Sequence, residues 1–244
     1  MAEKRKFIKE EELVDNKKPR IVRPVISLED LKKKEDGVYI LPDGDRIIST
    51  ITVGHLENRL IPSDEFWNEL LKTFPKEKPT FKLYGKECQS HRIIFEMSKL
   101  KKPYSYRSSS IGIENGFKSV ESFPKEIESI YEFCRSFDKR VSPSCLFNVY
   151  EGEDYISAHS DDEKKIIPLT PVFTFVFYVG ENRDPRPFIL NGKYENKTRI
   201  KFDLEHGSYL IMGGGCQVTH THEVPKAPKN KNKRISLTFR CFEK

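Results

Sequence analysis

Three side chains in the C-terminal half of the chain have the types and the spacing of metal ligands. His159 and Asp161 are separated by one residue, so on an extended segment both side chains would point to the same side. His222 lies on a later extended segment and could supply a third ligand. Two imidazoles and one carboxylate leave three positions open on an octahedral metal, the pattern typical of non-haem Fe(II) sites. The alternative interpretation is two surface histidines and an aspartate in a turn.

The last extended segment alternates strictly between apolar and polar residues. One face would carry Ile235, Leu237, Phe239 and Cys241, and the other face Arg234, Ser236, Thr238 and Arg240. If the polar face is open to water, this is an ordinary half-buried strand. If both faces are covered, the two arginines need anionic partners, because an unpaired buried charge is very costly. At roughly 3.3 Å per residue they lie about 20 Å apart, so one carboxylate cannot bind both.

Two more polar side chains precede the His159 segment. Asn148 and Tyr150 are two residues apart on a predicted strand, so they share one face and offer an amide and a phenol near the candidate ligands. Polar groups at the edge of the core are the alternative interpretation.

The elements that must position these residues change character along the chain. A helix is predicted from the capping pattern at 27–30 to Gly37, a hairpin across 42–45, and helices after Ser63 and after Ser122. Beyond Pro143 the periodicity becomes two, which predicts strands over 145–151, 172–180, 187–190, 198–204, 208–212, 217–224 and 234–242. Short strands joined by turns favour a mostly β sandwich or barrel with flanking α-helices.

Charge is distributed unevenly over the 244 residues, whose formal net charge is +6. Residues 72–107 carry ten basic and three acidic side chains, and residues 224–240 six basic and none acidic. Two such basic stretches suit a polyanionic partner if they meet in space, and otherwise form a solvated surface. Five cysteines without metal-ligand spacing indicate neither disulfides nor a zinc site. No apolar run or signal region is present, so we expect no membrane span and an intracellular protein, nuclear or cytoplasmic.

The C-terminal hundred residues resemble the AlkB family of Fe(II)- and 2-oxoglutarate-dependent dioxygenases. The motifs that carry the resemblance follow in order: Asn148-Val149-Tyr150, Gly152, His159-Ser160-Asp161-Asp162-Glu163, Gly207-Ser208-Tyr209-Leu210, His222-Glu223-Val224-Pro225 and the segment 234–240. Each motif is short, but their order and spacing together are specific. Upstream the resemblance extends more weakly through Tyr84-Gly85-Lys86, Arg92 and Tyr104-Ser105-Tyr106.

The resemblance implies a double-stranded β-helix (jelly roll) core with an N-terminal nucleotide-recognition lid. It implies that His159, Asp161 and His222 hold Fe(II) and that Arg234 pairs with the distal carboxylate of 2-oxoglutarate. Asn148 and Tyr150 would assist Arg234, and Arg240 would lie near the iron-chelating end of this cosubstrate. Ser236 and Thr238 share the same strand face and complete the predicted cosubstrate site.

In this family iron, 2-oxoglutarate and O2 serve the oxidative demethylation of alkylated nucleobases in DNA or RNA, with release of formaldehyde, succinate and CO2. The resemblance therefore implies a nucleic-acid partner, and we expect a monomer. The predicted substrate contacts are Tyr84, Gly85, Lys86, Arg92, Tyr104, Tyr106, Asp162 and Glu163. Two alternatives remain: an oxygenase that acts on a protein or a small molecule, and a nucleic-acid binding module whose oxygenase site is vestigial.

The predicted organisation has three parts: a flexible charged arm over 1–24, an extension of a helix and a hairpin over 25–58, and the AlkB-like dioxygenase domain over 59–244. Two choices remain open within the domain. His220 could compete with His222 as a ligand, although the spacing to Pro225 and Arg234 favours His222. Either Arg183 or Arg186 could occupy the family's arginine position.

Overall fold

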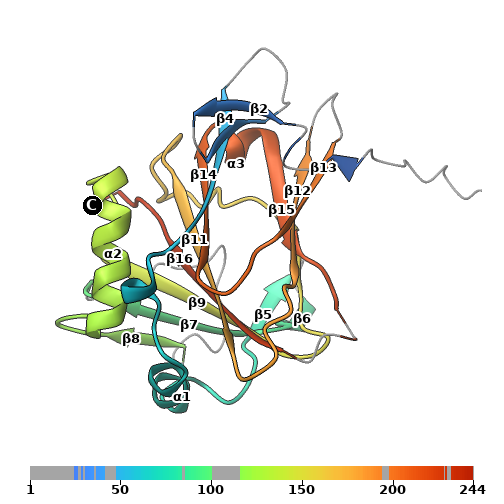
Figure 1. Cartoon of the computed structure of the whole chain (residues 1–244). Helices are drawn as coiled ribbons and strands as arrows, with labels where there is room; N and C mark the ends of the chain where they lie inside the picture. Colours follow the sequence, from blue (N-terminus) through green and yellow to red (C-terminus); the bar gives the residue numbers. More distant parts are fainter. Residues whose placement is uncertain are drawn as a thin grey trace, which may run out of the picture.

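Two β-sheets face each other, and two helices cover the outer face of the larger sheet (Figure 1). The computed structural model describes residues 25–26, 29, 31–35, 37–41, 48–83, 86–100, 116–193, 198–227, 229 and 232–243. Among these residues, none of the helices combines the length and the apolar character that a membrane crossing requires.

The strands follow the topology of a jelly roll. The larger sheet has the order β2 (Lys32–Glu35), β3 (Val38–Ile40), β4 (Ser49–His55), β14 (Ser208–Gly214), β11 (Val172–Val179), β16 (Lys233–Phe239), β9 (Ser144–Tyr150), β7 (Ile93–Ser98) and β8 (Phe117–Ser119). The smaller sheet has the order β1 (Val25–Ile26), β13 (Arg199–Asp203), β12 (Pro187–Gly192), β15 (His220–Val224) and β10 (Ile156–His159). From β9 to β16 the chain passes repeatedly between the sheets, so the predicted mostly β, jelly-roll fold is confirmed. A separate hairpin pairs β5 (Thr80–Leu83) with β6 (Lys86–Gln89).

Alternation along the central strands divides the core into two layers. On β11, Phe173, Phe175 and Phe177 pack toward the helices, whereas Val172 and Val176 pack between the sheets. The helices α1 (Asp64–Lys72) and α2 (Lys125–Phe137) supply the other side of the outer layer, as Figure 1 shows. Both predicted helices are present. Ser63 caps α1, since its hydroxyl oxygen accepts a hydrogen bond from the Phe66 amide at 3.2 Å.

The helix predicted from residues 27–30 to Gly37 is wrong where the structure describes it. Residues 32–35 form β2, and Gly37, at φ +72°, lies in the turn that leads into β3. Pairing of β3 with β4, and of β4 with β14, outweighs the local helix signal in this segment. The strands on either side of 42–45 do pair, although residues 42–47 and the arm at 1–24 lie outside the described residues. The division of the chain at 24 and 58 stays a prediction.

The strand predicted over 217–224 is wrong at its start. Residues 216–219 form the short helix α3 (Cys216–Thr219), and β15 begins at His220. The Gly215 carbonyl accepts hydrogen bonds from the amides of Val218 and Thr219 and from the Thr219 hydroxyl. This turn places the Gln217 side chain beside the segment that carries Asp161.

Candidate active site

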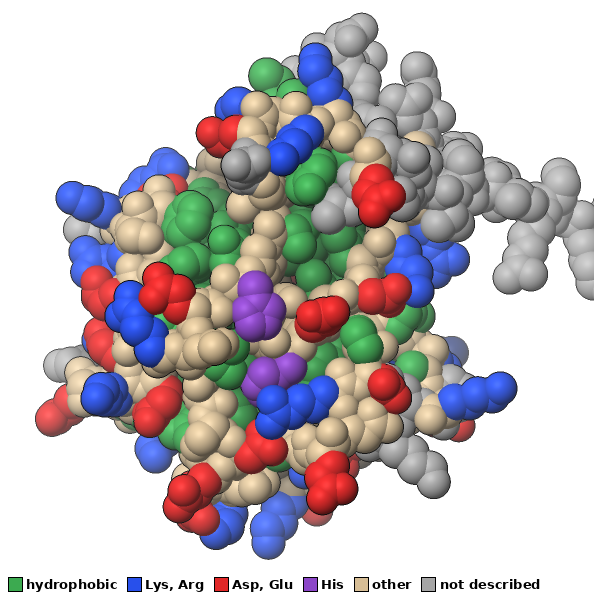
Figure 2. Space-filling view, viewed as in Figure 1, with side chains coloured by type: hydrophobic (Ala, Val, Ile, Leu, Met, Phe, Trp, Pro, Cys, Tyr) green, Lys and Arg blue, Asp and Glu red, His purple; other side chains and the backbone are tan. Residues whose placement is uncertain are grey.

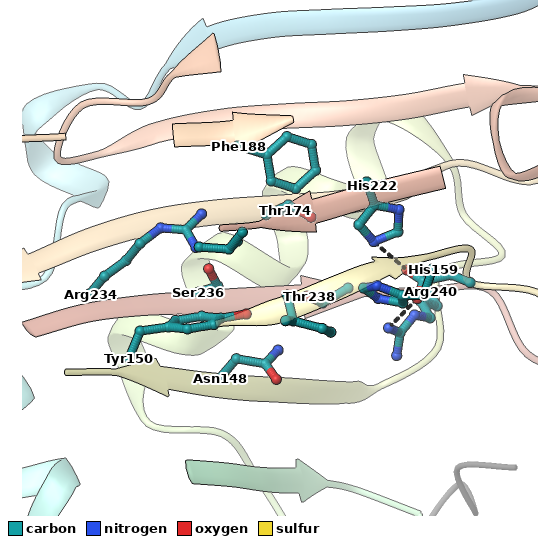
Figure 3. A pocket seen from close by; sticks show the side chains of 13 residues that line it. Asn148, Tyr150, His159, Thr174, Phe188, His222, Arg234, Ser236, Thr238 and Arg240 are labelled. Carbon is teal, nitrogen blue, oxygen red and sulfur yellow. Dashed lines mark hydrogen bonds and ion pairs between the residues drawn. The ribbon is translucent and has the colours of Figure 1, made fainter. Parts of the chain in front are cut away.

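A pocket lies between the two sheets, on the polar face of β16. Its lining comes from β9, β10, β11, β12, β15 and β16 and comprises Asn148, Tyr150, Ile156, His159, Asp161, Thr174, Phe188, His222, Val224, Arg234, Ser236, Thr238 and Arg240 (Figure 3). The strand register explains this set, because Tyr150 lies opposite Arg234, Asn148 opposite Ser236, and Thr174 opposite Thr238. All six residues predicted for the cosubstrate site therefore line one pocket.

The three predicted metal ligands meet at one end of the pocket. The antiparallel ladder of β10 and β15 sets His159 directly opposite His222, and their ring centroids are 4.2 Å apart. One ligand atom from each of His159, Asp161 and His222 lies within 4.8 Å of the other two. His220 is outside this group, and its Nδ1 lies 2.8 Å from the Thr219 hydroxyl. Two nitrogen donors and one carboxylate are the donor set of a facial Fe(II) site.

The protonation states of these side chains suit metal binding. Burial lowers the pKa of His159 and holds that of His222 at about 3, so both imidazoles are neutral at pH 7. Burial alone would raise the pKa of Asp161, but the Arg240 guanidinium, through its charge and its hydrogen bond, outweighs burial, and the carboxyl stays ionised. The Nδ1 atom of His159 lies 2.9 Å from the Ser157 carbonyl, which accepts its proton. The Nε2 lone pair then points toward Asp161, available for a metal.

Three neighbouring groups hold the segment that carries Asp161. Arg240 Nη2 donates to Asp161 Oδ1 at 2.8 Å. The backbone amide of Asp161 donates to Gln217 Oε1, and the Ser160 hydroxyl donates to the His220 carbonyl, each at 2.9 Å. Both bonds tie the loop after β10 to the segment 217–220, so the carboxylate and His222 are positioned by one connected set of contacts.

The opposite end of the pocket contains a buried guanidinium. Arg234 is 0% exposed, and none of its three guanidinium nitrogens has a hydrogen-bond partner among the described residues. Arg234 and Arg186 lie over the Tyr150 ring, with guanidinium carbons 5.2 and 5.8 Å from its centroid. Arg186 donates to the Asp154 carbonyl, and burial, followed by the charge of Arg234, lowers its pKa. This end of the pocket therefore favours an anion. A carboxylate fits best, because its two oxygens can accept two parallel N–H donors of the Arg234 guanidinium.

The structure distinguishes the two arginines of the 180–187 turn. Arg183 is exposed and forms an ion pair with Asp64 at 3.0 Å, whereas Arg186 is 0% exposed and faces Tyr150. Only Arg186 belongs to the surroundings of the pocket.

The sequence interpretation missed two pocket residues with a clear structural role. The Phe188 ring stacks on the His222 ring with centroids 5.6 Å apart and an interplanar angle of 20°. Thr174 lies on β11 beside Thr238. Both side chains lie on the inward face of their strands. Alternation in the sequence cannot identify them as pocket residues until the pairing of the strands is known.

The predicted substrate contacts fall into three groups. Tyr84, Gly85, Tyr104 and Tyr106 lie outside the described residues. Lys86 and Asp162 are exposed, and Glu163 is partly buried, which raises the pKa of its carboxyl. Arg92 is buried and donates from Nε to Asn148 Oδ1 at 2.6 Å, so it orients a pocket residue. Contact of these residues with a substrate stays a prediction.

The two basic stretches are more strongly neutralised than their residue counts indicate. Lys78 pairs with Asp154, Lys99 with Glu128, and Lys233 with Glu151. Figure 2 shows the resulting mixture on one face, where acidic and basic side chains alternate around two central histidines. This face therefore carries no uniform positive surface.

Comparisons with known proteins agree with this geometry. The family described as the 2OG-Fe(II) oxygenase superfamily matches residues 55–240. DNA oxidative demethylase ALKBH2 of Arabidopsis thaliana is 30% identical over 226 residues, which cover 78% of this chain and 68% of that protein. Human alpha-ketoglutarate-dependent dioxygenase alkB homolog 3 is 38% identical over 101 residues, 40% of this chain and 35% of that protein.

Among solved structures, that of OsALKBH1 aligns with a TM-score of 0.49 and 17% identity, over 78% of this chain and 97% of that chain. The family match and the relative from Arabidopsis each cover more than three quarters of the sequence. The chain belongs to the 2OG-Fe(II) oxygenase superfamily and, within it, to the AlkB family of dioxygenases that depend on Fe(II), 2-oxoglutarate and O2.

Proposed function

We propose that this protein removes alkyl groups, methyl above all, from nucleobases of DNA or RNA by oxidation. The observation that carries the proposal is the pocket itself, with three side chains that could hold a metal at one end and, at the other, a buried arginine without a hydrogen-bond partner among the described residues. The nucleic-acid substrate is supported by a relative named as a DNA oxidative demethylase.

The residues present fit the two groups that the family requires. His159, Asp161 and His222 would hold Fe(II), since they offer two neutral imidazoles and one ionised carboxylate within 4.8 Å. Arg234 would bind the distal carboxylate of 2-oxoglutarate, because its three nitrogens are buried without a partner among the described residues. When bound, these groups and O2 supply the oxidation, in which 2-oxoglutarate leaves as succinate and CO2 and the methyl group as formaldehyde.

The other pocket residues would orient the cosubstrate and the metal ligands. Tyr150 and Asn148 lie on the strand beside Arg234 and would guide the cosubstrate chain, with Ser236 and Thr238 as the floor between the two ends. Arg240 would fix the Asp161 carboxylate through its 2.8 Å hydrogen bond. The prediction that Arg240 also approaches the iron-chelating end of 2-oxoglutarate remains part of this proposal.

The base would reach the pocket by leaving its stack, because an alkyl group on a paired base is inaccessible to a buried site. In this proposal the predicted contacts Lys86, Asp162 and Glu163, with Tyr84, Gly85, Tyr104 and Tyr106, recognise the base or its backbone. Arg92 would act through Asn148, to which it is hydrogen-bonded. A nucleic-acid substrate further implies an intracellular location, and we keep the expectation of a monomer.

The test is a demethylation assay with purified protein, Fe(II), 2-oxoglutarate and O2. Oligonucleotides with one methylated adenine or cytosine are offered as single-stranded DNA, duplex DNA and RNA, and formaldehyde, succinate and the repaired base are quantified. We expect repaired base and succinate in equal amounts, and no product from His159→Ala or Arg234→Ala. Full activity of His159→Ala would overturn the metal assignment.

The same assay separates the alternatives. Succinate production that needs no nucleic acid and is insensitive to salt would favour a protein or small-molecule substrate. A vestigial site would bind nucleic acid and fail to bind iron. The complete triad in the pocket disfavours a vestigial site.

A further inference from the structure

Tyr155 lies between two basic side chains that come from the two basic stretches of the chain. The His91 ring stacks on the Tyr155 ring, with centroids 4.2 Å apart and an interplanar angle of 18°. Lys226 Nζ lies 4.9 Å from the centroid of the same ring. Because the imidazole occupies one side of the ring, the ammonium lies over the other side. We call His91, Tyr155 and Lys226 the Tyr155 stack.

The Tyr155 stack continues the ladder that carries the metal ligands. In the pairing of β10 with β15, His159 lies opposite His222 and Ile156 opposite Val224. Ile156 and Val224 line the pocket, Tyr155 directly precedes Ile156, and Lys226 follows Val224 by two residues. Four residues of extended chain separate Tyr155 from His159, about 13 Å at roughly 3.3 Å per residue. A strand whose base enters the pocket would therefore pass close to this stack.

The positive charge of the stack is available to a ligand. Lys226 is exposed, and among the residues that the structure describes no carboxylate pairs with it. Two acidic side chains of the turn before Tyr155 already have partners, since Glu151 pairs with Lys233 and Asp154 with Lys78. The Tyr155 ring holds the Lys226 ammonium in place without neutralising it. The exposed His91 imidazole and the Tyr155 hydroxyl add further hydrogen-bond donors.

We propose that the Tyr155 stack binds a phosphodiester group of the nucleic-acid strand whose alkylated base enters the pocket. This inference rests on the proposed function and adds to it a contact with the backbone beside the target base. An ammonium binds phosphate as a point charge, and such contacts fix the register of a strand without reading its sequence. The stack would thereby set how far the target base reaches toward His159 and His222.

The experiment measures the salt dependence of binding. Single-stranded oligonucleotides with one methylated adenine are titrated with Mn(II)- and 2-oxoglutarate-loaded protein and followed by fluorescence anisotropy. For Lys226→Glu we expect the slope of log K against log salt to fall in magnitude by about 0.7, the contribution of one single-strand phosphate. Binding should weaken by the same factor for oligonucleotides of different sequence. Lys226→Gln should lower the slope similarly, and Tyr155→Leu should weaken binding more than Tyr155→Phe.

Lys139→Glu is the matched control, because it makes the same change of charge at an exposed lysine that follows α2, away from the pocket. It should keep the wild-type slope, and thermal unfolding checks that every variant is folded. If the wild type demethylates the oligonucleotides but its salt slope equals that of both Lys226 variants, this inference is wrong and the proposed function stands. Failure of the wild type to bind or demethylate any oligonucleotide would overturn the proposed function together with it.

Discussion

Arg234 on β16 and Arg240 directly after this strand are both buried and both line the pocket, yet among the described residues only Arg240 has a carboxylate partner. Arg240 is 7% exposed and donates to Asp161 at 2.8 Å. Arg234 is 0% exposed, and its guanidinium nitrogens have no hydrogen-bond partner among the described residues. Its described neighbours are the Tyr150 ring and the second buried guanidinium, that of Arg186.

The difference suggests different roles: a structural one for Arg240 and, under the proposed function, 2-oxoglutarate binding for Arg234. A buried charge without a partner is unfavourable, so a fold gains nothing from Arg234 unless an anion joins it. Arg240 instead completes a pair inside the protein and holds a metal-ligating carboxylate. Both side chains are buried and both line the pocket, so the presence or absence of a carboxylate partner is what distinguishes them. Each prediction below tests one end of this comparison.

The largest effect is expected from removing Arg240. Arg240→Met would leave the Asp161 carboxylate buried without its guanidinium, which typically costs about 3–5 kcal/mol of folding free energy. Urea unfolding of the metal-free protein at neutral pH measures the change. Arg140→Met is the control, because Arg140 also pairs with an aspartate, Asp138 at 2.7 Å, but at the surface, where ion pairs contribute little. Equal effects of the two substitutions would contradict the structural role of Arg240.

The opposite outcome is expected for Arg234. Arg234→Met removes a buried charge that has no hydrogen-bond partner among the described residues, so the free energy of unfolding should stay the same or rise. The affinity for 2-oxoglutarate should fall by about 2 kcal/mol or more, since a buried charged contact is lost. Calorimetric titration of the Mn(II)-loaded protein with 2-oxoglutarate measures it. A destabilised variant with unchanged affinity would reverse the roles of the two arginines.

The end of the pocket that contains Asp161 should also make stability depend on pH, because His222 titrates there. Arg234 at the opposite end should not, because arginine does not titrate in this range. Burial lowers the pKa of His222 from its ordinary 6.5 to about 3. Between these values the unfolded chain binds a proton that the folded protein does not, so stability falls as the pH falls. About 2 kcal/mol should be lost between pH 6.5 and 5. Urea unfolding of the metal-free protein over this range measures the loss. His222→Gln should lose less stability than the wild type, because only the contribution of His159 remains. Identical pH profiles would refute the assignment.

Much of the fold could be predicted because its strands alternate clearly. Between 145 and 242 the period of two located the strands other than β10 and the start of β15, and the alternation on β16 identified the polar face that lines the pocket. The helix predicted up to Gly37 failed because distant strands decide the structure there: β2 and β3 extend a sheet through β4 and β14. Likewise, β10 is short and irregular, and its pairing with β15 has no local sequence signal.

The candidate site was predictable where chemistry depends on sequence spacing and not where it depends on packing. His159 and Asp161 are two residues apart, and His222 was a candidate third ligand on a later predicted strand, which the family resemblance also indicates. The partner of Arg240 was not predicted, because the turn that brings Asp161 to it depends on Ser160 and Gln217. Phe188 and Arg186 were missed or left open for the same reason: strand register and burial select them.

The smallest expected effect concerns the second support of Asp161. Gln217→Ala removes the acceptor of the Asp161 amide, while Arg240 still holds the carboxylate and Ser160 still donates to the His220 carbonyl, so the loop loses one of three restraints. Metal affinity should fall by about tenfold, as is usual for residues that orient a ligand, with little loss of stability. Titration with Mn(II) measures it, and Gln89→Ala, at an exposed glutamine of β6, is the control. Wild-type affinity in Gln217→Ala would mean that Arg240 and the Ser160 hydrogen bond position Asp161 without Gln217.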